Sequence, residues 1–169
     1  MSITIRSAKP DDCSKIYRFI CDLAEYEKAL EEVKCTAESL QKSLFEGAPC
    51  AHALMLEERG QAIGYAIYFF NYSTWLAAKG LYLEDIYVDP AYRGKGAGKM
   101  LMNWLANTAV SQGCKRFEWS VLDWNTPSIE FYESLGARSQ DEWLGYRLEG
   151  EALQRLASLN GKGYSAQGG

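Results

Sequence analysis

Residues 81–101 read LYLEDIYVDPAYRGKGAGKML, and this stretch decides the fold that the sequence predicts. It opens with an apolar and aromatic run over residues 81–88 that is typical of a β-strand. Glycines at positions 94, 96 and 98 follow, interleaved with cations, and the spacing of apolar residues from Met100 predicts an amphipathic helix. Free N–H groups and the dipole at a helix N-terminus attract anions, so this turn predicts an anion-binding site.

Further strands and helices are predicted on both sides of this stretch. Strands are expected over residues 3–6, 51–57, 62–70, 116–122 and 145–149, and helices from Pro10, over residues 36–45, after the glycines to about residue 110, and over residues 126–136. This order predicts a single α/β (α+β) domain over residues 1–159 with a mixed, mostly antiparallel central sheet of about six to seven strands flanked by helices. The glycine-rich residues 160–169 are expected to form a flexible tail.

Composition narrows the class of protein. The net charge of −4 argues against bulk nucleic-acid binding, and the longest apolar run, AIGYAIYFF, is too short to span a membrane. The N-terminus lacks the apolar segment of a signal peptide. Five scattered cysteines and one histidine show no metal-ligand spacing, so we expect no metal site and a location in the reducing cytoplasm.

The glycine-rich turn fits one of three phosphate-binding patterns. A P-loop requires Ser or Thr after Gly-Lys, but Gly96 follows Lys95, and the G-x-G-x-G spacing also fails the dinucleotide pattern G-x-G-x-x-G. The third pattern, Arg/Gln-x-x-Gly-x-Gly/Ala, matches residues 93–98. A pyrophosphate suits this turn, although a glycine turn that serves only backbone geometry is the alternative.

The stretch LEDIYVDPAYRGKGAGKMLM at 83–102, taken with WNTPSIEFYESLGA at 124–137, resembles the GNAT family of acetyl-CoA-dependent N-acetyltransferases. The segments LYLEDIYV, DWNTPSIEFY and LAEYEKALEEV (residues 23–33) are similar to its spermidine/spermine (diamine) branch, which includes thialysine acetyltransferases. The resemblance implies a sheet splayed at the acetyl-CoA site. It also implies that acetyl-CoA binds to Ile86, Tyr87, Val88, Arg93, Gly94, Lys95, Gly96, Ala97, Gly98, Lys99, Asn125, Thr126, Pro127 and Ser128.

The same resemblance implies two catalytic residues. Tyr132 matches the proton donor to the departing thiolate; a phenol with a pKa of about 10 stays protonated at neutral pH. Glu84 matches an acid that binds the substrate and accepts the proton of the amine. The residues alone allow plainer interpretations, in which Tyr132 packs in the core and Glu84 forms an ion pair or is exposed. Asp85 is expected on the opposite face of the strand from Glu84.

Substrate contacts are implied for Tyr26, Glu27, Glu84, Glu118, Trp119 and Ser120. Acids between Asp22 and Glu32 would attract a cationic amine, although a solvated helix face is the alternative. The predicted activity is therefore transfer of acetyl from acetyl-CoA to a primary amine of a small diamine, polyamine or lysine-like substrate. A protein N-terminus, an antibiotic or another amino acid as acceptor, or a non-catalytic CoA-binding module, are the alternatives. The resemblance also implies a homodimer.

Overall fold

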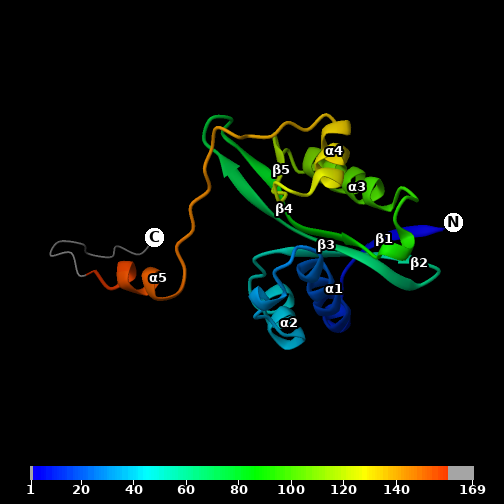
Figure 1. Cartoon of the computed structure of the whole chain (residues 1–169), viewed down its shortest axis with the longest axis horizontal. Coiled ribbons are helices and arrows are strands. Elements are labelled where there is room, and N and C mark those ends of the chain that lie inside the picture. The colour runs from blue at the N-terminus through cyan, green and yellow to red at the C-terminus, as the bar shows by residue number, and fades with distance from the viewer. Residues whose placement is uncertain (1, 160–169) are drawn as a thin grey trace. The chain divides into compact units, whose positions relative to one another are not determined.

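The structure is a computed structural model that describes residues 2–159, so the predicted tail at 160–169 lies outside the described residues. The chain divides into two compact units, the first ending at Asn125 and the second beginning at Thr126. In the first unit, five strands form one sheet in the order β1-β2-β3-β4-β5 (Figure 1). These strands are β1 (Ile3–Ser7), β2 (His52–Glu58), β3 (Gln61–Ser73), β4 (Ala78–Val88) and β5 (Phe117–Trp119). Neighbours are antiparallel except β4 and β5, which confirms the predicted mixed, mostly antiparallel sheet.

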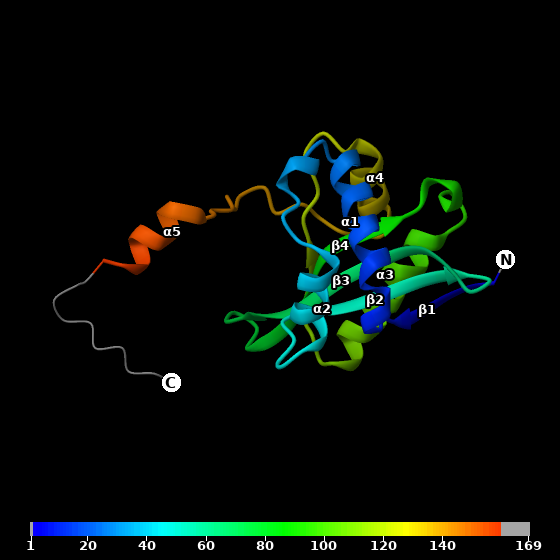
Figure 2. The ribbon, with the colours of Figure 1, turned by 90° about the horizontal axis from the view of Figure 1, so that it is seen from below.

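Helices cover both faces of this sheet. Helices α1 (Cys13–Tyr26) and α2 (Ala37–Phe45) lie on one face, and α3 (Ala97–Ser111) lies on the other (Figures 1 and 2). Three short 3-10 helices precede α1, α2 and α3, namely η1 (Pro10–Asp12), η2 (Leu30–Glu32) and η3 (Pro90–Tyr92). The predicted start of α2 is confirmed, because Thr36 Oγ1 accepts a 3.1 Å hydrogen bond from the Ser39 amide.

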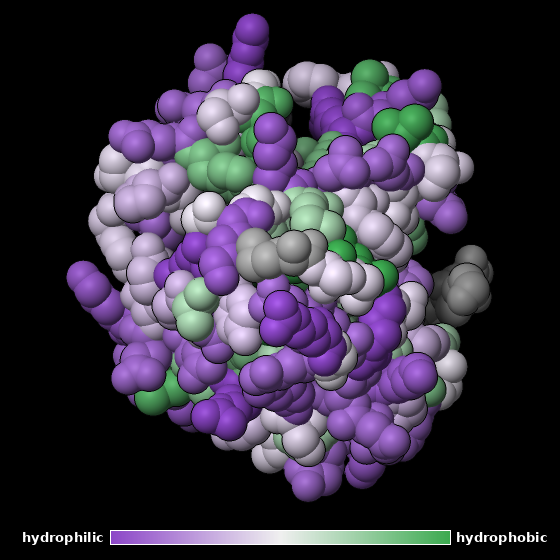
Figure 3. Space-filling model, turned by 90° about the vertical axis from the view of Figure 1, so that its right-hand side faces the viewer, coloured by the Kyte–Doolittle hydropathy of each residue, from purple (hydrophilic) through white to green (hydrophobic). Residues whose placement is uncertain are grey.

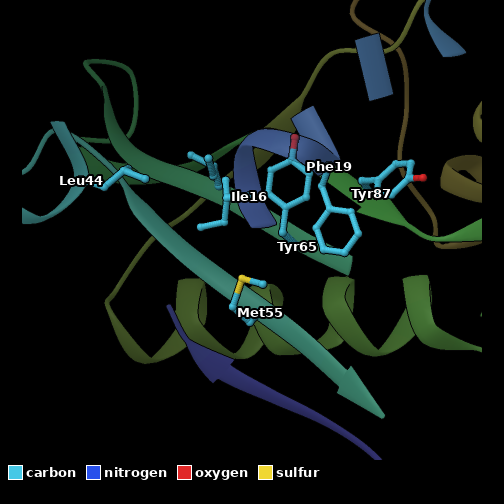
Figure 4. Close-up of a cluster of buried hydrophobic side chains, with 7 residues drawn as sticks. Ile16, Phe19, Leu44, Met55, Tyr65 and Tyr87 are labelled. Carbon is cyan, nitrogen blue, oxygen red and sulfur yellow. The ribbon is translucent and has the colours of Figure 1, made fainter. Parts of the chain in front are cut away.

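The core under α1 is aromatic. Phe19 of α1 stacks on Tyr65 of β3, with 6.0 Å between ring centroids, and contacts Tyr87 of β4 at 5.4 Å (Figure 4). Ile16, Leu44, Met55 and Ile67 complete this cluster. Since burial of a large apolar side chain contributes about 1.5–3 kcal/mol, this cluster fixes α1 firmly against the sheet.

A second apolar layer joins the sheet to α3. Leu101 and Leu105 of α3 are fully enclosed, as are Leu54 and Leu81 of the sheet. Tyr68 of β3 meets Trp104 of α3 at 6.3 Å between ring centroids. Tyr65 and Tyr68 therefore mark opposite faces of the sheet, one under α1 and the other under α3.

Strand β4 contains a β-bulge at Glu84. Ile67 of β3 pairs with Asp85, and the next residue, Tyr68, pairs with Leu83, so Glu84 is an extra residue on β4. Two residues apart on a regular strand share a face, but the bulge reverses this relation. Leu83 consequently lies on the α3 face with Tyr68, while Asp85 lies on the α1 face.

The second unit contains α4 (Thr126–Ser134) and α5 (Gly150–Ala157). Helix α4 ends as predicted, since Gly136 has φ +93° and its amide donates to the Glu133 carbonyl. The strand predicted at 145–149 is wrong: these residues form no strand, and Tyr146 is 94% exposed, so the apolar alternation has no sheet to pack on. Helix α5 was not predicted.

The described sheet has five strands, fewer than the six to seven expected. Besides the missing strand at 145–149, β5 ends at Trp119 and not at residue 122. Its pairing with β4 stops at Leu83, immediately before the bulge, so the following residues have no strand beside them there. The fold class itself is the α/β arrangement that the sequence predicts.

Figure 3 shows one side of the molecule in space-filling form. The side shown in Figure 3 is mostly hydrophilic, with hydrophobic groups confined to separate small patches. Among residues 2–159, no helix has both the length and the apolar character needed to cross a membrane.

Candidate active site

The predicted anion-binding turn forms where η3 runs into α3. Gly94 and Gly96 have φ values of +75° and +81°, a left-handed conformation that favours glycine. A Cβ atom added to either glycine would meet no atom within 4 Å, so the turn borders open space. The first intrahelical bond runs from the Met100 amide to the Gly96 carbonyl at 3.0 Å. The amides of Ala97, Gly98 and Lys99 therefore have no acceptor within α3 and suit a pyrophosphate, as does the charge of Lys95 and Lys99.

The strand that leads into this turn has an open edge. Strand β4 pairs with β5 only over Leu81–Leu83, so its last residues have no strand on that side. The Asp89 amide donates to the Ile63 carbonyl of β3 at 2.8 Å. Because backbone groups alternate along a strand, those of Ile86 and Val88 point to the opposite, open edge. This edge matches the predicted splay and can receive the amides and carbonyl of a pantetheine arm.

Arg93, the first residue of the turn, packs on two aromatic rings. Its guanidinium carbon lies 5.5 Å from the ring centroid of Tyr26 and 5.6 Å from that of Tyr87. Its Nε donates a 2.8 Å hydrogen bond to the Val88 carbonyl on the open edge. The side chain thus ties the turn to β4 and to the end of α1.

Asn125 is the one predicted acetyl-CoA residue in the 125–128 segment that belongs to the first unit. It is 9% exposed, and its Oδ1 accepts a 3.1 Å hydrogen bond from the hydroxyl of Tyr26. Beside it, the ring of Trp124 lies 6.1 Å from that of Tyr26. The end of α1 is therefore in contact with residues from both segments that the sequence assigns to acetyl-CoA.

An acidic pair lies on the α1 face of the sheet. Glu27 follows the last residue of α1, and Asp85 lies beyond the bulge of β4. Burial raises the pKa of Glu27, and the charge of Asp85 raises this pKa further. A carboxylate whose ionisation is opposed by a neighbouring negative charge is a suitable partner for a cationic nitrogen.

Tyr65 forms a hydrogen bond with Asp85, one of the two carboxylates of this pair. Its hydroxyl donates a 2.8 Å hydrogen bond to Oδ2 of Asp85, and its side chain is fully enclosed. This hydrogen bond favours the charged carboxylate, but burial is the larger effect, so the pKa of Asp85 is raised above its ordinary value. Burial and the nearby Asp85 together raise the pKa of Tyr65 well above 10, so this phenol is protonated at neutral pH.

The remaining predicted substrate residues fall on different parts of the sheet. Glu118 pairs with Tyr82, whose ring contacts Phe69, so Glu118 shares the α1 face with Asp85. Ser120 Oγ lies 2.8 Å from the Tyr82 hydroxyl. Trp119 pairs with Leu83 and so belongs to the α3 face. Glu84 is exposed at the bulge.

Tyr132 lies on α4 in the second unit, together with Thr126, Pro127 and Ser128 at the start of this helix. Within the unit the Tyr132 ring contacts that of Phe131, with 5.5 Å between centroids. Tyr132 is half-buried, and its catalytic role stays a prediction.

Sequence reasoning missed Asp85 and Tyr65 as members of the site. Asp85 stands next to Glu84 in the sequence, and strand alternation alone could not say which of the two would face α1. The signal that could have found Tyr65 is a tyrosine amid the apolar residues of a buried strand, because an enclosed hydroxyl requires a polar partner.

This chain is similar to known acetyltransferases. The model of the acetyltransferase (GNAT) family matches residues 15–137, a range that continues across the boundary between the two units. A thialysine N-epsilon-acetyltransferase of Sus scrofa is 42% identical over 167 residues, covering 92% of this chain and 98% of the relative. An L-ornithine N5-acetyltransferase of Arabidopsis thaliana is 46% identical over 97 residues, covering 57% of this chain and 42% of the relative.

Solved structures support the fold. An integron cassette protein from V. cholerae superposes with a TM-score of 0.79 at 26% identity, covering 94% of this chain and 99% of that one. A ribosomal-protein-alanine N-acetyltransferase from Brucella melitensis superposes with a TM-score of 0.68 at 18% identity, covering 88% of this chain and 99% of that one.

Proposed function

Since this chain belongs to the acetyltransferase (GNAT) family and is an acetyl-CoA-dependent N-acetyltransferase, we propose that its acceptor is a small lysine-like or diamine substrate. The observation that carries this proposal is the half-buried pair of carboxylates, Glu27 and Asp85, of which Asp85 accepts a hydrogen bond from Tyr65. Thialysine, ornithine and lysine each combine a reactive terminal amine with a second nitrogen that is cationic at neutral pH. The relatives named for thialysine and ornithine support this class of acceptor.

The acidic pair is suited to the second nitrogen of such a substrate. A charge in a partly buried site is strongly favoured only when an opposite charge accompanies it. Binding of an ammonium would therefore stabilise the ionised forms of Glu27 and Asp85, whose pKa values burial raises. An amine with no second cationic group would leave the negative charges of Glu27 and Asp85 without a compensating positive charge.

The reaction requires groups for two protons. The amine nitrogen attacks the carbonyl carbon of the thioester, the C–N bond forms, and the C–S bond breaks with its electron pair on sulfur. We assign the proton lost by the amine to Glu84, directly or through water, and the proton gained by the thiolate to Tyr132. The open-edge N–H groups of Ile86 and Val88 are suited to donate hydrogen bonds to the carbonyl oxygen as it gains negative charge.

A homodimer is part of the same proposal. The hairpin between β3 and β4 carries Tyr72, Trp75 and Leu76, which are 67%, 78% and 46% exposed. Exposed apolar side chains gathered at one tip suit a contact with a second protein surface. Light scattering of the purified protein tests this: a monomer mass at micromolar concentration would contradict the homodimer.

The acceptor is tested by following thiol release from acetyl-CoA across a panel of amines. We expect thialysine, lysine, ornithine and putrescine to be consumed faster than butylamine, which is a primary amine with no second charge. Butylamine consumed as fast as thialysine would contradict the role of Glu27 and Asp85. If no amine in the panel is consumed while acetyl-CoA binds, the proposed acceptor class is wrong.

A further inference from the structure

Tyr26 lies between the two segments that we assign to acetyl-CoA. Its hydroxyl donates a 3.1 Å hydrogen bond to Oδ1 of Asn125, and the guanidinium of Arg93 lies 5.5 Å from its ring centroid. Asn125 is almost fully buried. Tyr26, at the end of α1, thus contacts Arg93 of the pyrophosphate turn through its ring and Asn125 through its hydroxyl.

Arg93 is held in this position by two further contacts. Its guanidinium lies 5.6 Å from the Tyr87 ring centroid, and its Nε donates to the Val88 carbonyl at 2.8 Å. A guanidinium over an aromatic face is attracted by the ring electrons, and two rings restrain it more than one. Movement of the turn would therefore carry the Tyr26 ring with it, or would break these contacts.

The residues after Tyr26 extend the connection to the acceptor side. Glu27 follows directly and senses the charge of Asp85. Lys28 adopts a left-handed backbone with φ +59°, and its Nζ lies 4.6 Å from the ring centroid of Trp124. The turn that carries Glu27 is thus fixed on both sides by contacts with the Trp124–Asn125 segment.

We propose that Tyr26 is a positioning residue that couples the binding of acetyl-CoA to the binding of the amine. When the pyrophosphate turn and Asn125 are ordered by acetyl-CoA, Tyr26 holds the end of α1 and places Glu27 opposite Asp85. This inference rests on the proposed function, since it takes Glu27 and Asp85 as the acceptor site. The coupling is reciprocal, so the amine strengthens the binding of the coenzyme by the same factor.

The experiment compares the Kd of thialysine for the free protein with its Kd for protein saturated with CoA, which is unreactive. We expect CoA to tighten thialysine binding by about fivefold or more in the parent protein, within the usual range for coupled sites. Tyr26→Phe keeps the ring beneath Arg93 but loses the hydrogen bond to Asn125. We expect the ratio of the Kd without CoA to the Kd with CoA to fall at least about threefold in this variant. Tyr146→Phe, at a tyrosine that is 94% exposed, is the matched control and should leave the ratio unchanged.

A second variant tests the other contact of Tyr26. Arg93→Lys keeps the charge but loses the planar group on the rings, and we expect it to reduce the ratio as well. A ratio near one in the parent protein, or an unchanged ratio in both variants, would overturn the inference. If CoA itself does not bind, the proposed function fails, and this inference fails with it. If CoA binds and thialysine is acetylated normally by a protein without coupling, only the role of Tyr26 is wrong.

Discussion

The hydroxyl of Tyr65 donates a 2.8 Å hydrogen bond to Asp85 from a fully enclosed position on the neighbouring strand. Tyr65 and Asp85 are brought together because both lie on the α1 face, where Ile67 pairs with Asp85 and Tyr65 with Tyr87. Asp85 is a half-buried carboxyl that accepts a hydrogen bond and still has a raised pKa, so a cation bound beside it would stabilise its ionised form.

Asp85→Asn keeps a hydrogen-bond acceptor for Tyr65 and removes the charge. Since a hydrogen bond to a charged group contributes about 1.5–3 kcal/mol, we expect kcat/KM for thialysine to fall by about tenfold to a hundredfold. The value for butylamine should change much less, because this amine has no second cation. Asp11→Asn, at an exposed aspartate, is the control. Equal losses for thialysine and butylamine would contradict recognition by Asp85.

The free energy of unfolding should vary with pH because of the same carboxyl, that of Asp85. The pKa of Asp85 is higher in the folded than in the unfolded protein, so its contribution to stability is present below its ordinary pKa of 3.8 and is lost as the pH rises through the folded value. We therefore expect Asp85→Asn to raise the free energy of unfolding at pH 7 and to leave it little changed at pH 3.5. Urea unfolding at both pH values measures this, and an equal effect at the two pH values would contradict the assignment.

Tyr132→Phe tests the proposed proton donor. General acid catalysis typically gives a factor of about 10²–10⁴ in rate, so we expect kcat to fall by that factor while acetyl-CoA still binds. Tyr146→Phe, at a tyrosine that is 94% exposed, should leave kcat unchanged. A kcat of Tyr132→Phe within about twofold of the parent value would show that another group protonates the thiolate.

Gly96→Ala tests the pyrophosphate turn. Both Gly96 and Gly47 have positive φ values and open space where a Cβ would lie, so alanine at either should cost about 1–2 kcal/mol of stability. Only Gly96→Ala should also weaken CoA binding, because only Gly96 precedes the amides of α3. Calorimetric titration with CoA measures the difference. If the two variants bind CoA with equal affinity, the turn does not bind the pyrophosphate.

Arg6 joins the first strand to the start of α1. It donates to Asp12 at 2.7 Å and 2.9 Å and to Glu57 at 2.8 Å. Its guanidinium lowers the pKa of Asp12, so this contribution to stability is present above the ordinary pKa of 3.8 and is lost as the pH falls through the lower folded value. We expect Arg6→Met to cost about 1.5–3 kcal/mol at pH 7 and less at pH 2, by urea unfolding. A pH-independent loss would assign the effect to packing alone.

Local chemistry predicted the elements that depend on it. Thr36 starts α2 because its side chain binds an amide of the first turn, and Gly136 ends α4 because it adopts a left-handed backbone. The turn at residues 93–99 could be predicted in the same way, because the spacing of its glycines and cations directly indicates a helix N-terminus. These features need no knowledge of distant residues.

The features that depend on strand pairing could not be predicted from the local sequence. The alternation at 145–149 favoured a strand, yet a strand also needs a partner, and these residues have none among the described residues. The length of β5 is set by where β4 bulges. The choice between Glu84 and Asp85 at the acidic pair likewise depends on register with β3, which no local pattern encodes.

The bulge at Glu84 gives the two halves of β4 different tolerance to change. Leu81–Leu83, just before it, pair with strands on both sides, whereas the residues after it pair with β3 alone. Deleting Glu84 would make Leu83 and Asp85 neighbours on a regularly alternating strand, so Leu83 would stay on the α3 face and Asp85 on the α1 face. Loss of this one residue would therefore spare the packing on both faces of the sheet and would remove the Glu84 carboxylate together with the irregularity beside which β5 ends.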